Sequence, residues 1–286
     1  MMLTGETGIA VQFKITANMT ERLQTTSFIR TKLQTIASEI IRDEVVDKWF
    51  LMDNIYPVLA LVIAYLVFVL KVGPKFMENR KPLNIKGIIL AYNFFQMINN
   101  GWIVYLLFTT PGAVSHLAQN KCAPMEKSNP LFYAMCAGSW YFFMSKVYDL
   151  LDTVFFVLRK KQSHVTFLHV YHHANMVLSC WAYLKYIKGE QGVLIGVLNS
   201  FVHVVMYTYY FLSALGPQVQ KYLWWKKYIT KLQLLQFGIV CMYALFFVVR
   251  NCVQSQVLIY YAMFQAITFS ILFADFYRKA YLKKKQ

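Results

Sequence analysis

The sequence predicts an all-α membrane protein with seven transmembrane helices. Hydrophobic residues make up 58% of its 286 residues and charged residues only 15%, whereas soluble domains carry about 25% charged residues. The apolar residues are gathered into blocks long enough to cross a bilayer, which takes about 20 residues in a helix. Only helices and closed barrels satisfy every backbone polar group in lipid, and the sequence lacks the short alternating stretches of a barrel.

Seven apolar blocks define the expected helices. Their approximate bounds are 52–70, 86–109, 131–158, 165–187, 192–215, 229–250 and 257–281. We therefore expect a helical domain over residues 51–281. Residues 1–50 contain no apolar core of the signal-peptide type, so the first block is expected to stay as the membrane anchor. Four residues of this lumenal N-terminal segment follow helical spacing and predict an amphipathic helix: Ile29, Leu33, Ile36 and Ile40.

The basic residues indicate how the helices are oriented. The formal net charge is +16, yet residues 1–55 hold six Lys/Arg against seven Asp/Glu, so the excess lies in the remainder of the chain. It is concentrated at alternate block ends, around Lys75–Lys86, Arg159–Lys161, Lys221–Lys227 and Arg278–Lys285. The positive-inside rule places these ends and the C-terminus in the cytoplasm, and an odd number of crossings places the N-terminus on the other side. Membrane topology thus explains the charge without nucleic-acid binding.

Short features near both ends favour the endoplasmic reticulum membrane. Asn18 begins a glycosylation sequon, Asn-Met-Thr, in the predicted lumenal segment. Residues 282–286 form a cytosolic tail whose final Lys-Lys-Lys-Gln resembles a dilysine retrieval signal. A chance tripeptide and lysines that snorkel at a helix end are the alternatives. Cys122 and Cys252 both fall in predicted lumenal loops, where an oxidising compartment favours a disulfide between them.

Polar and ionisable side chains interrupt four of the apolar blocks. Each ionisable one costs about 2.5–3.5 kcal/mol at the centre of a membrane helix, so we expect a functional reason for it. The residues are Lys146, Asp149, Asp152, Thr153, His169, His172, His173, Asn175, Asn199, His203, Tyr207, Tyr209, Tyr210, Thr230, Gln233 and Gln236. Within a block most recur every three or four residues and so share one helix face. All four sets fall in the cytoplasmic half, which predicts one shared cavity for catalysis or transport; hydrogen bonding between helices is the alternative.

These polar segments resemble the four signatures of the elongase family for very long chain fatty acids, in the family's order and spacing. They are Lys146–Thr153 (KVYDLLDT), His169–His173 (HVYHH), His203–Tyr210 (HVVMYTYY) and Thr230–Gln236 (TKLQLLQ). Gly73-Pro74, Arg80-Lys81-Pro82 and Tyr92-Asn93 resemble the family's upstream pattern, so the similarity runs from about residue 50 to 280. In one departure, Asp149 stands where the family usually has Glu. The resemblance implies six helices around a narrow substrate tunnel, with the first helix packed outside.

The resemblance also implies an activity, the condensing step of microsomal fatty-acid elongation. A long-chain acyl-CoA and malonyl-CoA would give a 3-oxoacyl-CoA two carbons longer, with release of CO2 and CoA. Such a 3-oxoacyl-CoA synthase is an acyltransferase, and neither a metal nor another cofactor is expected. The implied partners are membrane lipid and the reductases and dehydratase of the elongation cycle, while a homo-oligomer is left open.

The residues themselves favour histidine chemistry. No cysteine is placed with the histidines, whereas histidine can form covalent intermediates. In the family the middle histidine of the HxxHH box is implicated, which is His172 here; its acyl-imidazole would be attacked by the enolate from malonyl-CoA. That enolate needs fixed hydrogen-bond donors. The expected supporting residues are His203, Asn199 and Tyr207 as donors, His169 and His173 as positioners, and Asp149 and Asp152 as groups that orient the imidazoles.

The anionic CoA must stay near the cytosol while its acyl chain enters the membrane. Basic residues at the predicted cytoplasmic helix ends are therefore candidate phosphate contacts, although each alone is more typical of a snorkelling side chain. The candidate substrate-binding residues are Lys146, Arg159, Lys161, His164, Tyr209, Lys226, Thr230, Gln233, Gln236 and Arg278.

Two other protein classes were weighed. A membrane di-iron desaturase or hydroxylase also carries HxxHH, but two metals ask for about eight ligands. The chain has six histidines, of which His116 lies in a predicted lumenal loop, and no HxxxH partner box. A seven-helix transporter or receptor explains the number of helices but not the histidine box beside the stripe Lys146–Asp152. Stoichiometric iron in the purified protein would favour the first alternative, and internal inverted repeats would favour a transporter.

Overall fold

The computed structural model describes residues 43–119, 125–187, 192–252 and 255–282, together with Met19, 24–28, 30–31 and 34. The chain divides into two units, Met1–Ile40 and Ile41–Gln286. In the first unit, residues 24–28 are helical and exposed. Several predictions fall outside the described residues: the sequon at Asn18, the amphipathic positions Ile29, Leu33, Ile36 and Ile40, the cysteine Cys122, and the tail signal in residues 283–286.

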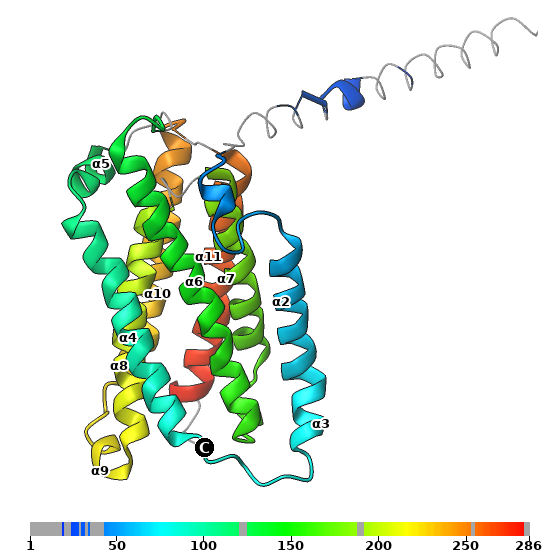
Figure 1. Ribbon diagram of the computed structural model, residues 1–286, viewed down its shortest axis with the longest axis vertical. Helices are drawn as coiled ribbons and strands as arrows, with labels where there is room; N and C mark the ends of the chain where they lie inside the picture. The colour runs from blue at the N-terminus through cyan, green and yellow to red at the C-terminus, as the bar shows by residue number, and fades with distance from the viewer. Residues whose placement is uncertain are drawn as a thin grey trace, which may run out of the picture. The chain divides into compact units, whose positions relative to one another are not determined.

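The second unit is helical throughout its described part, where no strand occurs (Figure 1). Its α-helices are α2 (Tyr56–Val67), α3 (Gly73–Met77), α4 (Lys86–Thr109), α5 (Ala113–Gln119), α6 (Pro130–Leu158), α7 (Phe167–Ile187), α8 (Val193–Leu215), α9 (Pro217–Gln220), α10 (Lys226–Val249) and α11 (Gln256–Tyr277). The π-helical turn Phe68–Val72 joins α2 to α3. The all-α prediction is thus confirmed, and each predicted block corresponds to a long helix within a few residues at its ends.

Four of the long helices are sufficiently long and apolar to cross a membrane. They cover Tyr56–Met77, Val193–Leu215, Lys226–Val249 and Gln256–Leu282. The other three predicted spans, α4, α6 and α7, have 24, 29 and 21 residues. They are long enough to cross a bilayer, but the polar stripes that they carry reduce their apolar character. The structure therefore supports a multi-pass membrane protein by composition and length.

Local residue chemistry explains several helix ends. Asn129 accepts a hydrogen bond from the backbone N–H of Leu131 at 3.0 Å and precedes Pro130, an arrangement suited to a helix start. Ser255 caps α11 in the same way. Gly216 has a φ of +132°, which L side chains rarely adopt, and so ends α8 before α9 begins. These residues fix where the long helices begin and end.

Neighbouring helices pack along one another in a series of pairs. The most extensive contacts join α4 to α8, α10 to α11 and α6 to α7. Further contacts join α4 to α6, α8 to α10 and α7 to α11, while α2 lies on α7 and α3 on α6 (Figure 1). Gly73 permits the close approach of α3, because a Cβ there would lie 2.7 Å from Cγ1 of Val157. Basic residues gather where α6 ends and α10 begins, and we call this end of the helices the basic end. We call the opposite end of the helices the far end.

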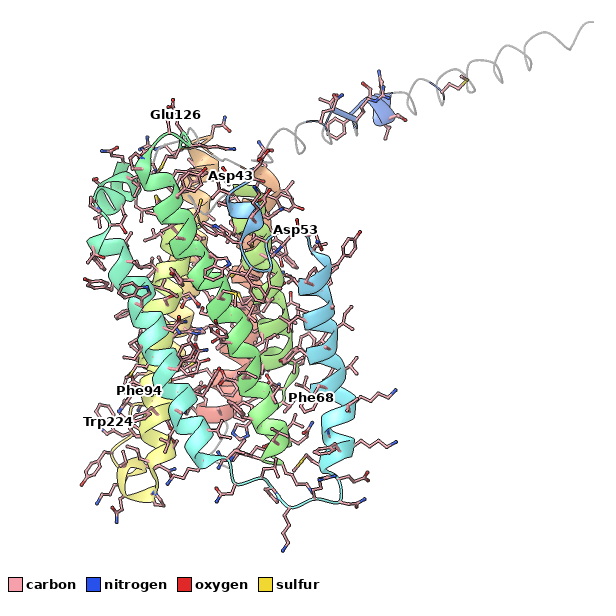
Figure 2. All side chains as sticks on the ribbon, in the orientation of Figure 1. Asp43, Asp53, Phe68, Phe94, Glu126 and Trp224 are labelled. Carbon is pink, nitrogen blue, oxygen red and sulfur yellow. The ribbon has the colours of Figure 1, made fainter. Side chains whose placement is uncertain are left out.

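The segment before α2, residues 43–53, is hydrogen-bonded to side chains of α6 and α7 at the far end. The indole N–H groups of Trp140 and Trp181 donate to the backbone carbonyls of Phe50 and Leu51, at 3.1 and 2.8 Å. Lys185 donates to the carbonyls of the next two residues. Figure 2 shows Asp43 and Asp53 together at this end. The segment therefore fixes the start of α2 against the helices behind it.

Asp43 anchors the beginning of this segment. It is buried and accepts hydrogen bonds from the backbone N–H groups of Val45 and Val46 and from the hydroxyl of Tyr133, and it pairs with Lys127 at 3.2 Å. Burial raises the pKa of Asp43, but these hydrogen bonds and the lysine charge outweigh burial and hold its pKa below the ordinary 3.8. Also at the far end, Cys252 is disulfide-bonded.

Candidate active site

A buried ion pair lies at the centre of the polar stripe on α6. The ammonium of Lys146 is 3.0 Å from Oδ2 of Asp149 and 3.3 Å from Nδ1 of His203 on α8. These side chains are almost fully buried, with exposures of 1%, 1% and 4%. Nδ1 of His203 also lies 3.5 Å from Oδ2 of Asp149. An ammonium can only donate, so Nδ1 accepts from Lys146 in the tautomer that carries its proton on Nε2, and in that tautomer an N–H is available on the opposite side of the ring.

Tyr207 connects the two carboxylates of α6. Its hydroxyl is 2.8 Å from Oδ1 of Asp149 and 2.7 Å from Oδ2 of Asp152. A tyrosine hydroxyl has one proton, so it can donate to only one of these oxygens at a time. The second contact is a hydrogen bond only when that carboxyl group itself carries a proton. The tyrosine thus offers one proton that either carboxylate can accept inside the helical bundle.

Helix α4 completes this network with residues that the sequence reasoning did not select. Gln96 is fully buried and donates its amide N–H to Asp149 and, at 3.2 Å, to the hydroxyl of Tyr92. The hydroxyl of Tyr92 also lies 3.3 Å from that of Tyr207. Tyr92, Gln96 and Asn100 recur every four residues within an apolar block, the same spacing signal that identified the other stripes. The predicted stripes included neutral residues such as Thr230, Gln233 and Gln236, but not the three on this helix.

The three histidines of the HxxHH box share one face of α7, as their spacing predicts. The ring centroids of His169 and His173 are 4.3 Å apart, and those of His172 and His173 are 5.4 Å apart. His172 faces α11, with its ring 5.0 Å from Phe269. Nε2 of His169 is buried and has no hydrogen-bond partner within the described residues. His172 is therefore the member of the box that borders the cavity described next.

A cavity of about 120 Å³ lies among α6, α7, α8, α10 and α11. Its lining is mainly apolar and extends from His172 along α7 to Leu184 near the far end. Two asparagines interrupt the apolar wall close to the histidine. Nδ2 of Asn175 and Oδ1 of Asn199 are buried without a hydrogen-bond partner in the described part of the chain, although Nδ2 of Asn199 is 3.5 Å from Oε1 of Gln236. The cavity can thus hold an elongated apolar ligand with a polar group beside His172.

Four cationic or titratable side chains gather at the basic end. Arg159 ends α6, Lys161 and His164 lie in the following loop, and Lys226 begins α10. Burial, then the charges of Arg159 and Lys226, lower the pKa of Lys161. Burial, then the charges of Lys161 and Lys226, lower the pKa of His164. Arg159 and Lys226 therefore lie near enough to Lys161, and Lys161 and Lys226 near enough to His164, to act on them electrostatically, which suits an anionic ligand.

The remaining candidate residues lie in different surroundings. Thr230 is buried one turn into α10, and Gln233 donates to the sulfur of Met206 at 3.8 Å. The ring of Tyr209 contacts Trp225, with centroids 5.3 Å apart. Arg278 is exposed and pairs with Asp275 at 2.7 Å. Lys146, which was grouped with the substrate-binding residues, lies within the buried network and away from the cations of the basic end.

Metal-binding side chains do not converge in the part of the chain that the structure describes. No three histidine, cysteine, aspartate or glutamate side chains are arranged there to hold an ion. The histidines instead contact one another through their rings, and both carboxylates of the α6 stripe are occupied by tyrosine, glutamine or lysine donors.

Comparison with known proteins places this chain in one family. The family model described as ELO, GNS1/SUR4 family, matches residues 50–286. A very long chain fatty acid elongase of Aedes aegypti is 39% identical over 239 residues, which are 83% of this chain and 66% of the mosquito protein. Very long chain fatty acid elongase 4 of Homo sapiens is 38% identical over 247 residues, 86% of this chain and 78% of the human protein. Very long chain fatty acid elongase 1 of Mus musculus is 39% identical, and the match covers 85% of this chain and 88% of the mouse protein.

Proposed function

Because the chain belongs to the ELO (GNS1/SUR4) family of fatty-acid elongation enzymes, we propose that it catalyses the condensing step of that process. Its substrates are a long-chain acyl-CoA and malonyl-CoA, and its products are a 3-oxoacyl-CoA two carbons longer, CO2 and CoA. The observation that carries the proposal is the position of His172. This imidazole borders an elongated apolar cavity, close to unpaired polar atoms of two asparagines and to the helix that carries His203.

The first chemical step transfers the acyl group to His172. A ring nitrogen of His172 attacks the thioester carbonyl carbon, the carbon–sulfur bond breaks, and the ring proton passes to the departing CoA thiolate. The resulting acyl-imidazole stays activated toward nucleophiles. Apolar residues around His172, among them Phe269 at 5.0 Å between ring centroids, exclude the water that would hydrolyse it.

The second step joins the carbons. Malonyl-CoA loses CO2, the electron pair of the broken bond forms an enolate, and its carbon attacks the acyl carbonyl. The carbon–nitrogen bond to His172 breaks, and the ring takes up one proton. His203 suits the stabilisation of the enolate, because in the tautomer whose Nδ1 accepts from Lys146 at 3.3 Å its Nε2–H is free to donate. Asp149 holds this lysine in place, and Tyr207 donates toward Asp149 and Asp152.

The arrangement of the helices supports a tunnel for the acyl chain. In the proposed fold α4, α6, α7, α8, α10 and α11 surround the tunnel and α2 packs outside them; all of these six except α4 line the cavity described above, and the pairwise contacts agree with this order. The basic end faces the cytosol, where Arg159, Lys161, His164 and Lys226 contact the phosphates of CoA. The proposed location is the endoplasmic reticulum membrane, beside the reductases and dehydratase that process the product.

Incorporation of radiolabelled malonyl-CoA into longer acyl chains tests the proposal. Microsomes that express the parent chain should form labelled 3-oxo products, and His172→Ala should abolish them. His116→Ala is the matched control, because His116 lies on α5, outside the cavity and the network, and it should retain activity. Full activity of His172→Ala would exclude the covalent step. Stoichiometric iron in active purified protein would instead favour a di-iron oxidation.

A further inference from the structure

A second cavity lies beside the first, on the side of α4. It occupies about 50 Å³ between α4, α6 and α8, and the described residues that line it are apolar except for Thr110 and Ser139. Ile103, Leu106 and Met135 are typical wall residues. The two cavities have Ser139, Phe142, Gly192 and Gly196 in common. They are therefore adjacent compartments that meet along the face of α6.

Phe142 is the only large side chain in this shared boundary. Ser139 is small, and Gly192 and Gly196 have no side chain. The ring of Phe142 lies directly over Gly196, since a Cβ at that glycine would be 3.2 Å from Cδ1 of the ring. The ammonium of Lys146 stands 4.8 Å from the ring centroid, a favourable cation–π distance. The ring is thus held between the α8 backbone and the buried ammonium of Lys146, and it separates the two spaces.

We propose that Phe142 is a specificity-determining residue and that the smaller cavity is a second compartment for the acyl chain. When the ring turns away from Gly196, the cavities join and a long acyl chain can extend toward α4. The occupant is hydrocarbon, because no charged side chain of the described residues lines the smaller cavity and it continues from the apolar part of the first. This inference rests on the proposed function, since it assigns the chain-binding space of the same condensing enzyme.

Substitution of Phe142 tests directly whether its ring separates the two cavities. Phe142→Ala joins the compartments permanently, so the longest labelled product should gain at least one elongation cycle over that of the parent. The readout is the distribution of product lengths from a panel of saturated acyl-CoAs with radiolabelled malonyl-CoA, and it does not depend on total rate. Where the alanine variant gives too little protein, Phe142→Leu keeps the apolar surface and should shift the distribution in the same direction by less.

Refilling the smaller cavity provides the decisive comparison. Gly138 lines only this cavity, and a Cβ there meets nothing within 4 Å. Gly138→Leu added to Phe142→Ala should therefore restore the parent's product lengths. Gly101→Leu is the matched control, because Gly101 also has open space at its Cβ but lines neither cavity; with Phe142→Ala it should leave the longer products unchanged.

The outcomes separate this inference from the proposed function. An active parent whose Phe142 variants make products of unchanged length overturns the partition, as does a Gly138→Leu double variant that still makes the longer products. A parent that incorporates no malonyl-CoA with any acyl-CoA overturns the condensing function itself.

Discussion

Removal of the charge of Lys146 should destabilise the protein far more than removal of any exposed lysine. Lys146→Met leaves the buried carboxylate of Asp149, now without the ammonium 3.0 Å away, inside the bundle. Loss of one partner of a buried ion pair costs about 3–5 kcal/mol. At roughly 2–4 °C per kcal/mol for a domain of this size, the melting temperature should fall by roughly 6–20 °C. Thermal unfolding of the purified protein in detergent measures this fall.

The double variant Lys146→Met, Asp149→Leu shows whether the two residues act as a pair. Replacement of both by apolar residues removes the isolated charge, so most of the lost stability should return. Gln96 and Tyr207 keep other partners, Tyr92 and Asp152 respectively. A double variant that is no more stable than Lys146→Met alone would refute the coupling. Lys279→Met, at an exposed ion pair with Asp275, is the control and should leave the melting temperature unchanged.

Catalysis should respond differently from stability in this series. Lys146→Met and the double variant both remove the ammonium that lies 3.3 Å from Nδ1 of His203, so both should lose activity even where stability returns. Loss of one fixed donor to a transition state typically costs about 10²–10³ in kcat. A double variant with parental kcat would show that the tautomer of His203 does not depend on Lys146.

Three further perturbations have defined directions. Tyr207→Phe removes the proton shared with Asp149 and Asp152 and should lower kcat for malonyl-CoA incorporation while the protein stays folded; unchanged kcat would remove the network from the mechanism. Lys161→Ala should raise the KM for acyl-CoA and leave kcat unaltered if the cations of the basic end bind phosphate, and an effect on kcat alone would contradict that role. The third perturbation is a substitution of Asp43. Burial raises the pKa of this carboxyl group, but its hydrogen bonds and the charge of Lys127 lower the pKa more strongly, to below the ordinary 3.8. The stability it contributes is fully present above that ordinary pKa and is lost as the pH falls through the lowered value. Melting temperatures between neutral pH and about pH 3 should fall less steeply for Asp43→Asn than for the parent, and parallel curves would refute the linkage.

The sequence predicted those parts of the molecule that depend on local spacing. Apolar length located the long helices, and the spacing of His169, His172 and His173 placed their rings on one face, because helical periodicity determines which residues share a side. The rotation of α6 about its axis is set by packing against α4, α7 and α8 and could not be read from spacing. Spacing placed Lys146 and Asp149 in one stripe, but the contact of Lys146 with His203 on α8 depends on this packing.

Contacts between helices distant in sequence were also beyond prediction. Gln96 donates to Asp149 across 53 positions of the chain, and a neutral glutamine in an apolar block gives a weaker signal than a charge. The role of Phe142 depends on the absence of a side chain at Gly196. An aromatic residue in an aromatic-rich helix carries no distinguishing pattern, so only the packed structure identifies it as a wall.

The hydrogen bonds that hold residues 43–53 limit how this segment can vary among related chains. The tryptophans and the lysine that hold it bind carbonyl oxygens of the main chain at Phe50, Leu51 and Met52. Main-chain acceptors are present whatever side chains occupy those positions, so these three contacts tolerate substitution there. An insertion or deletion between them and α2 would move every acceptor out of register. Selection should therefore preserve the length of residues 43–53 more strictly than their identities.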